Sequence, residues 1–169
     1  MRLAVNLVNG STPAGVVVAV AGRARLARGP DGLLTATGYR LRVPAAPAFC
    51  LGNVIVTRLD GLPPRLLRHE GRHATQFACC GGLVMVPLYL GAAAASWALT
   101  GDFGSRNVFE RRAGLADGGY ADRPPRPWLA AWVTASRAAR PARPAGVPGG
   151  HGPGPGPAGR AGSTASPSR

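Results

Sequence analysis

Short runs of β-branched or alternating apolar residues, separated by glycine, proline and aspartate, dominate the first 60 positions of the chain. Runs of this kind predict strands bounded by turns. The expected strands are Leu3–Val8, Val16–Ala21, Leu33–Thr37, Tyr39–Val43 and Asn53–Arg58. Because the runs are short and closely spaced, they predict an antiparallel β-meander over residues 1–60.

Beyond Asp60 the apolar positions recur at helical spacing. Pro63-Pro64 fits a helix start and Gly81-Gly82 fits a stop, which predicts a helix over residues 64–80. A second helical segment is expected from Ser105 to Ala116. The buried face of the first helix is predicted to hold Leu66, His69, Glu70, His73, Phe77 and Cys80.

Residues 77–101 contain no charged side chain. A stretch of this length can span a bilayer, but glycines and Pro87 interrupt it. We therefore expect a buried or membrane-apposed helix or helical hairpin that is broken near Pro87. A short amphipathic piece at residues 128–133 is expected to dock on the domain or on a surface.

Composition changes the picture at the C-terminal end. Residues 137–169 are nearly all Ala, Arg, Pro, Gly and Ser, with Val147 as the only larger aliphatic residue. Such a segment cannot bury enough apolar surface to offset its ordering entropy, so we expect a disordered tail. The predicted fold class is α+β: a β region over residues 1–60, a helical region over residues 61–136, and the tail.

The formal net charge of +13 comes entirely from arginine, since the chain has no lysine. Seven of the 20 arginines follow the last acidic residue, Asp122. Such a tail can touch nucleic acid or anionic lipid without specificity, but we favour a solvated tail and predict no specific nucleic-acid binding. The three cysteines form no spaced framework and the N-terminus makes a poor signal peptide. A cytoplasmic location is expected, with contact to a membrane surface left open.

Histidine and glutamate are scarce, and they gather in one string. Two of the three histidines and one of the two glutamates lie in His69-Glu70-Gly71-Arg72-His73, an H-E-x-x-H pattern. On a helix, two histidines four residues apart project to the same side and suit one tetrahedral zinc ion. Glu70 is angled away from the metal and can serve as general base toward a zinc-bound water.

A third protein ligand must come from elsewhere in the chain. Cys80 lies roughly 10 Å beyond His73 along the helix axis, which is too far. His151 belongs to the expected disordered tail. Glu110 is the candidate left, and Ala113 three residues later is small enough to let a second ligand helix approach the first.

Three short segments carry a resemblance to a known family. They read H-E-G-R-H-A-T-Q from His69, V-P-L-Y-L from Val86 and F-E-R-R-A from Phe109. This combination resembles the gluzincin metallopeptidases. Among them it is most similar to small uncharacterised bacterial proteins with an H-E-x-x-H-x-x-Q helix, a G-P-L-Y-L-like turn and an E-x-x-A segment. The resemblance covers about residues 51–120.

The resemblance implies a small helical zincin-like domain that binds zinc and hydrolyses a peptide or protein substrate. The implied zinc ligands are His69, His73 and Glu110, with Glu70 as the base. Gln76 matches the family's glutamine by position alone.

The sequence departs from the family where many gluzincins have an aspartate that orients a ligand histidine. Gly114 occupies that position, and Asp117 is the candidate substitute acceptor. Tyr89 and Tyr120 are the candidate transition-state donors, by elimination.

Other interpretations stay open at this point. His69 and His73 can be ordinary helix residues, and Glu110 can pair with Arg106 or Arg111 on a solvated face. A zinc ion can staple the two helices without catalysis. A third alternative is a small membrane-associated protein without metal. Our expectation is a zinc-dependent metallopeptidase-like protein.

Overall fold

A computed structural model of the chain describes residues 1–128 and 131. One four-stranded sheet and several helices make up these residues, which confirms the predicted α+β class. In chain order the elements are α1 (Arg2–Val8), α2 (Ser11–Ala21), β1 (Arg25–Arg28), η1 (Pro30–Gly32), β2 (Leu34–Thr37), β3 (Ala48–Leu51), β4 (Val54–Thr57), α3 (Pro64–Cys79), η2 (Gly82–Val84), α4 (Met85–Thr100) and α5 (Val108–Ala113).

The sheet has the strand order β1-β2-β4-β3. The β1–β2 and β3–β4 pairs are antiparallel, whereas β2 and β4 run parallel. The prediction of an antiparallel meander is therefore wrong for the central pair. Strand β3 lies at the sheet edge and runs opposite to β2. The hairpin turn after β3 reverses the chain, so β4 lies between β3 and β2 and runs parallel to β2.

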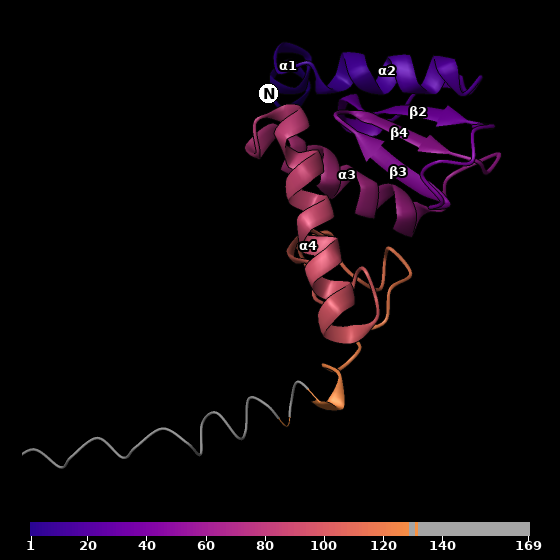
Figure 1. Cartoon of the computed structure of the whole chain (residues 1–169). Coiled ribbons are helices and arrows are strands. Elements are labelled where there is room, and N and C mark those ends of the chain that lie inside the picture. Colours follow the sequence, from indigo (N-terminus) through magenta and orange to yellow (C-terminus); the bar gives the residue numbers. More distant parts are fainter. Residues whose placement is uncertain (129–130, 132–169) are drawn as a thin grey trace, which may run out of the picture.

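Helices cover both faces of the sheet (Figure 1). On one face, Ala19 of α2 packs with Ala36, Tyr39, Val54 and Val56. On the other face, Ile55 packs with Leu33 and with Ala74 of α3. Because successive side chains of β4 enter two different cores, the strand is apolar without alternation.

The strands predicted at Leu3–Val8 and Val16–Ala21 are instead the helices α1 and α2. Continuous apolar runs carry no periodicity that separates a strand from a buried helix. Pro13 does not break this helix, because it lies in the first turn of α2, where a backbone N–H has no helical partner to lose. The first 21 residues are therefore helical, and residues 1–60 are not a purely β region.

The strand predicted at Tyr39–Val43 is also absent from the described sheet. Side-chain hydrogen bonds take the place of strand pairing there: the Arg58 guanidinium donates to the backbone carbonyls of Leu41, Pro44 and Ala46. Two strands without a prediction, β1 and β3, are the edge strands of the described sheet.

Helix α3 matches its prediction closely. Pro64 occupies its first turn and Gly81 follows it in the left-handed conformation, so both signals act as expected. Its buried residues are His69, Glu70, His73, Ala74 and Phe77.

The chain breaks before α4 at Gly81-Gly82, not near Pro87, because Pro87 lies in the first turn of α4. Within the described residues, Gly82–Thr100 is the one helix long and apolar enough to cross a membrane; the α1–α2 pair also passes this test if its 77° bend is accepted.

Helix α5 is shorter than predicted. Asn107 caps it by accepting from the Phe109 backbone N–H, and the chain leaves the helix at Gly114. The predicted tail at 137–169, and nearly all of the amphipathic piece predicted at 128–133, lie outside the described residues. All three cysteines are free.

Candidate metal centre

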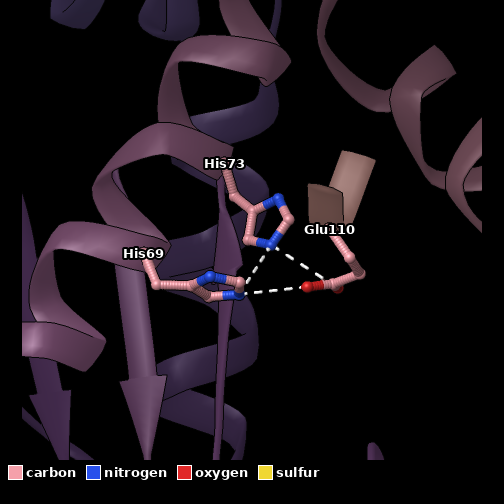
Figure 2. A group of neighbouring side chains, drawn as sticks. All are labelled: His69, His73 and Glu110. Carbon is pink, nitrogen blue, oxygen red and sulfur yellow. Dashed lines mark hydrogen bonds and ion pairs between the residues drawn. The ribbon is translucent and has the colours of Figure 1, made fainter. Parts of the chain in front are cut away.

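Three of the sequence-predicted residues converge between α3 and α5. His69 and His73 lie one turn apart on α3, and Glu110 reaches them from α5 (Figure 2). The His69 Nε2 atom lies 3.1 Å from Glu110 Oε2, and His73 Nε2 lies 3.6 Å from Glu110 Oε1. All three side chains are buried, and their candidate ligand atoms lie within 4.8 Å of one another. This His-His-Glu group can hold a metal ion.

Hydrogen bonds on the far side of each imidazole decide which nitrogen carries the proton. His69 Nδ1 lies 3.1 Å from the Gly114 carbonyl oxygen and 3.2 Å from that of Ala113. His73 Nδ1 lies 2.8 Å from Gln76 Oε1. Since these partners only accept, both neutral rings carry hydrogen on Nδ1.

Both Nε2 atoms then present lone pairs to the same small space. They lie 3.1 Å apart, and apart from the nearby His69 Nε2 the carboxylate oxygen Glu110 Oε2 has no hydrogen-bond donor among the described residues. Three converging electron pairs in a buried site repel one another unless a cation lies between them. The residues present therefore fit a bound metal ion.

Gln76 connects the two ligand helices. Its Oε1 accepts from His73 Nδ1, and its Nε2 donates to the Phe109 carbonyl at 2.9 Å. The amide orientation follows from this pair of contacts, because Phe109 offers only an acceptor. Gln76 was named from its position alone, and its place in the structure is beside the outer nitrogen of His73.

Asp117 does not contact a histidine. Its carboxylate pairs instead with Arg72 at 2.9 Å and with Arg68 at 3.4 Å. The acceptors for His69 are the backbone carbonyls of Ala113 and Gly114, which the turn at the end of α5 directs inward. The expectation that Asp117 replaces an orienting carboxylate is therefore wrong, because main-chain oxygens already fill that role.

Arg72 and Gly118 support His69 and were missed from the sequence. Arg72 Nη1 donates to the Ala113 carbonyl at 2.6 Å, which fixes one of the acceptors for His69. Gly118 packs directly on the imidazole, so that a Cβ there would lie 2.5 Å from His69 Cε1. Neither carries a sequence signal, since an arginine on a helix and a glycine in a turn are usual.

Glu70 is buried beside the two histidines, and its Oε2 atom has no hydrogen-bond donor. Burial raises the pKa of this carboxyl group above its usual value, while His73 and His69 oppose that shift. Cys50 on β3 lines the same cavity as Glu70. Burial raises the pKa of the Cys50 thiol well above 9.0, and the Glu70 carboxylate adds to the rise.

The two tyrosines named as candidate donors both line the site, with different partners. The Tyr89 hydroxyl donates to Glu110 Oε1 in a short hydrogen bond. The Tyr120 ring lies 6.5 Å from the His69 ring, centroid to centroid. Burial and then the Glu110 carboxylate raise the pKa of Tyr120 to about 12 and raise that of Tyr89 further. Both phenols therefore stay protonated at neutral pH.

The pKa values of the candidate ligands Glu110 and His69 shift in opposite directions. Burial opposes ionisation of Glu110, but its contacts with His69 and His73 hold the pKa of this carboxyl group at about 2. Burial likewise opposes the charge on His69, but the hydrogen bond and charge of Glu110 raise its pKa above 6.5. Without a cation, a proton shared at His69 relieves part of the lone-pair repulsion.

A cavity of about 500 Å³ opens onto the metal centre. His69, Glu70, His73 and Glu110 line it, together with Val43, Pro44, Ala46, Pro47 and the residues of β3. Most of the remaining lining is apolar, including Phe49, Leu66, Phe77, Met85, Val86 and Leu90. The volume lies within the range of small-ligand sites, about 300–1,000 Å³.

Comparison of the chain with protein-family models, with curated proteins and with solved structures finds no match to any of them. The resemblance to gluzincins stays a prediction from the three sequence segments.

Proposed function

We propose that the protein is a zinc-dependent hydrolase that cleaves peptide bonds. The observation that carries this proposal is the contact of each histidine's outer nitrogen, Nδ1, with an oxygen acceptor. A neutral ring held in this way carries its proton on Nδ1, so both inner Nε2 atoms and the Glu110 carboxylate direct lone pairs into the same small space. Two imidazoles and one carboxylate are a usual ligand set of catalytic zinc, which leaves a fourth position open.

When bound, zinc supplies a Lewis acid and lowers the pKa of a coordinated water toward about 7. Glu70 follows the first ligand in sequence and lines the same cavity. Its Oε2 atom lacks a protein donor, so this oxygen is free to accept a proton from water and return it to a leaving amine. A carboxylate already bonded to protein donors would be less able to do so.

The cavity offers a place for an extended peptide because β3 is an edge strand of the described sheet. The Arg58 N–H donates to the Pro47 carbonyl, and Phe49 and Leu51 stand opposite Val56 and Val54. By the alternation of an antiparallel ladder, the peptide groups of Ala48 and Cys50 then point away from β4. A substrate strand can add to this edge, as peptides do at other exposed sheet edges.

A structural zinc ion is the alternative function, and the burial of all three ligands favours it. The same ion would staple α3 to α5, whose contact also includes Gln76. The cavity favours catalysis, because a purely structural site is closed by four protein ligands.

Metal analysis of the purified chain tests the proposal first. We expect about one zinc per chain, and its loss in His73→Ala. Glu70→Gln should retain zinc and lose hydrolysis of a casein or unstructured-peptide substrate. Folded protein without zinc would exclude both zinc functions, whereas zinc without any hydrolysis would leave the structural one.

A further inference from the structure

The described residues leave most of the circumference of helix α4 uncovered. Met85, Ala93, Ser96 and Thr100 are its buried residues, and at 100° per residue they lie within a narrow arc. Its large apolar residues elsewhere are exposed: Leu88 is 51% and Leu90 60% exposed, and Trp97 is 48% exposed. With Val86 and Leu99 they span roughly 220° of the helix surface. Leu83 and Val84 of η2, just before the helix, are exposed as well. We call Leu83, Val84, Val86, Leu88, Leu90, Trp97 and Leu99 together the outer face of α4.

An arc of this width is unusual for a helix at a water-exposed surface. A helix that packs against one neighbour presents an apolar stripe of about 100° or somewhat more, whereas a helix that is apolar nearly all round is covered on most sides. Among the residues that the structure describes, only 22% of an 18-residue window of Gly82–Thr100 is buried. One partner helix would leave most of the outer face in water, whereas the acyl chains of a lipid bilayer can cover a wider arc.

Aromatic and cationic groups lie together at the C-terminal end of this face. Trp97 stacks on the exposed Phe103 ring, with centroids 6.3 Å apart. The Arg126 guanidinium lies 5.2 Å from the centroid of the Trp97 ring, and Arg126 has no acidic partner among the described residues. Tryptophan and arginine are the residues that settle at the headgroup level of a membrane.

Charge supports an anionic lipid surface over an acidic protein. No acidic residue occurs between Glu70 and Asp102, so the outer face itself carries no negative charge. The described residues 1–128 contain 15 arginines and seven acids, a net charge of +8. Juxtaposed apolar and basic groups bind bilayers through both forces at once.

We propose that the outer face of α4 docks on the surface of an anionic lipid bilayer without spanning it. The opposite face of α4 is hydrogen-bonded to the rest of the protein. Tyr89 donates to Glu110, and the Ser96 hydroxyl donates to the Asp102 carbonyl and accepts from the Arg106 N–H. The helix therefore lies against the bilayer with one side held by protein.

The docking surface continues into the metal cavity. Val86 and Leu90 belong to the outer face and also line the cavity. A bilayer at this surface would lie beside the cavity entrance, so the hydrolase would act on polypeptide segments close to the membrane. This consequence rests on the proposed function, whereas the docking itself does not.

Co-sedimentation with vesicles tests the docking, using the full chain. One set of vesicles contains equal parts of phosphatidylcholine and phosphatidylglycerol, and the other contains phosphatidylcholine alone. The test variant is Leu83→Glu with Leu88→Glu, since neither side chain lines the cavity. The matched control is Leu41→Glu with Leu59→Glu, two leucines of similar exposure that lie outside α4 and do not line the cavity. Both variants carry the same added charge and keep the arginine-rich residues 137–169.

We expect the wild type to bind the anionic vesicles, to bind neutral ones more weakly, and to be released by carbonate. The test variant should bind roughly 30-fold more weakly, because two exposed leucines are lost from the contact with the bilayer. The control should bind as the wild type does. Equal loss in both variants, retention after carbonate, or no vesicle binding at all would overturn the proposal. Concentration-dependent self-association that only the test variant abolishes, without vesicle binding, would assign the face to a second copy instead.

Zinc content and hydrolysis of a soluble peptide are measured on the same samples. If these are absent from the wild type while vesicle binding follows the expected pattern, the proposed function fails and the docking stands. If they are present in all variants while vesicles do not bind, the docking fails alone.

Discussion

The Gln76 side-chain oxygen lies 2.8 Å from His73 Nδ1, while the same amide donates to the Phe109 carbonyl of α5. One side chain thus fixes the tautomer of a candidate ligand and ties that ligand to the helix that carries Glu110. The position of Gln76 three residues after His73 places both on one helix face.

Replacement of Gln76 by alanine should weaken zinc binding by about 10- to 100-fold, because the imidazole loses its orienting acceptor. Competition with a zinc chelator of known affinity measures the change. Thr75→Ala is the matched control, since the exposed Thr75 hydroxyl bonds only the Gly71 carbonyl and Arg2. Equal zinc affinity in Gln76→Ala and wild type would show that Gln76 does not orient a metal-binding His73.

Replacement of Gly118 by alanine should displace His69, since the added Cβ would lie 2.5 Å from the imidazole. We expect at least about a tenfold loss in zinc affinity and a destabilisation of about 1–3 kcal/mol, the usual cost of overpacking. Gly61→Ala, where a Cβ meets nothing within 4 Å, is the control. Chelator competition and thermal unfolding measure both effects; wild-type zinc affinity in Gly118→Ala would mean that His69 can turn away without cost.

The sequence was sufficient for the local features of the metal centre but not for their surroundings. The H-E-x-x-H string could be placed on α3 because a single helix fixes the relation between His69 and His73. Glu110 could be chosen because few alternatives exist in a chain with two glutamates. The choice of Asp117 as orienting group failed, because backbone carbonyls leave no trace in the side-chain sequence.

The sheet shows the same division between local and long-range information. Val54-Ile55-Val56 was identifiable as a buried strand from its own residues, whereas the direction of β4 depends on which strands flank it. The apolar runs of α1 and α2 were assigned to strands because periodicity cannot separate a short buried helix from a strand. Tertiary packing decides such segments.

The pH dependence of stability should differ between metal-free and zinc-loaded protein. In the metal-free state the pKa of His69 lies above 6.5, so its contribution to stability is present below pH 6.5 and is lost as the pH rises through that higher pKa. The pKa of Glu110 is about 2 against a usual 4.5, so its contribution is present above pH 4.5 and is lost as the pH falls toward 2.

Thermal unfolding of the metal-free protein should therefore show its highest Tm between about pH 4.5 and 6.5. Zinc replaces the proton at His69, so the decline on the alkaline side should disappear when zinc is added. His69→Gln is the control, since this variant has no titrating group at the position. A Tm of the metal-free wild type that rises steadily through pH 6.5 to 8 would contradict the assignment of the His69–Glu110 pair.

Tyr89 and Tyr120 should separate into a residue that positions a ligand and a residue that contacts substrate. The Tyr89 hydroxyl already donates to Glu110, so Tyr89→Phe removes a donor from a zinc ligand and should lower zinc affinity by about tenfold. The Tyr120 phenol lines the cavity beside His69, and its pKa of about 12 keeps it a donor at neutral pH. Tyr120→Phe should keep zinc and lower kcat/KM for a peptide substrate by about 100-fold, the cost of removing one donor to a developing oxyanion. Zinc titration and steady-state hydrolysis on both variants measure the two effects. Full hydrolysis by Tyr120→Phe would remove it as a donor, and reduced activity at normal zinc affinity in Tyr89→Phe would exchange the two roles.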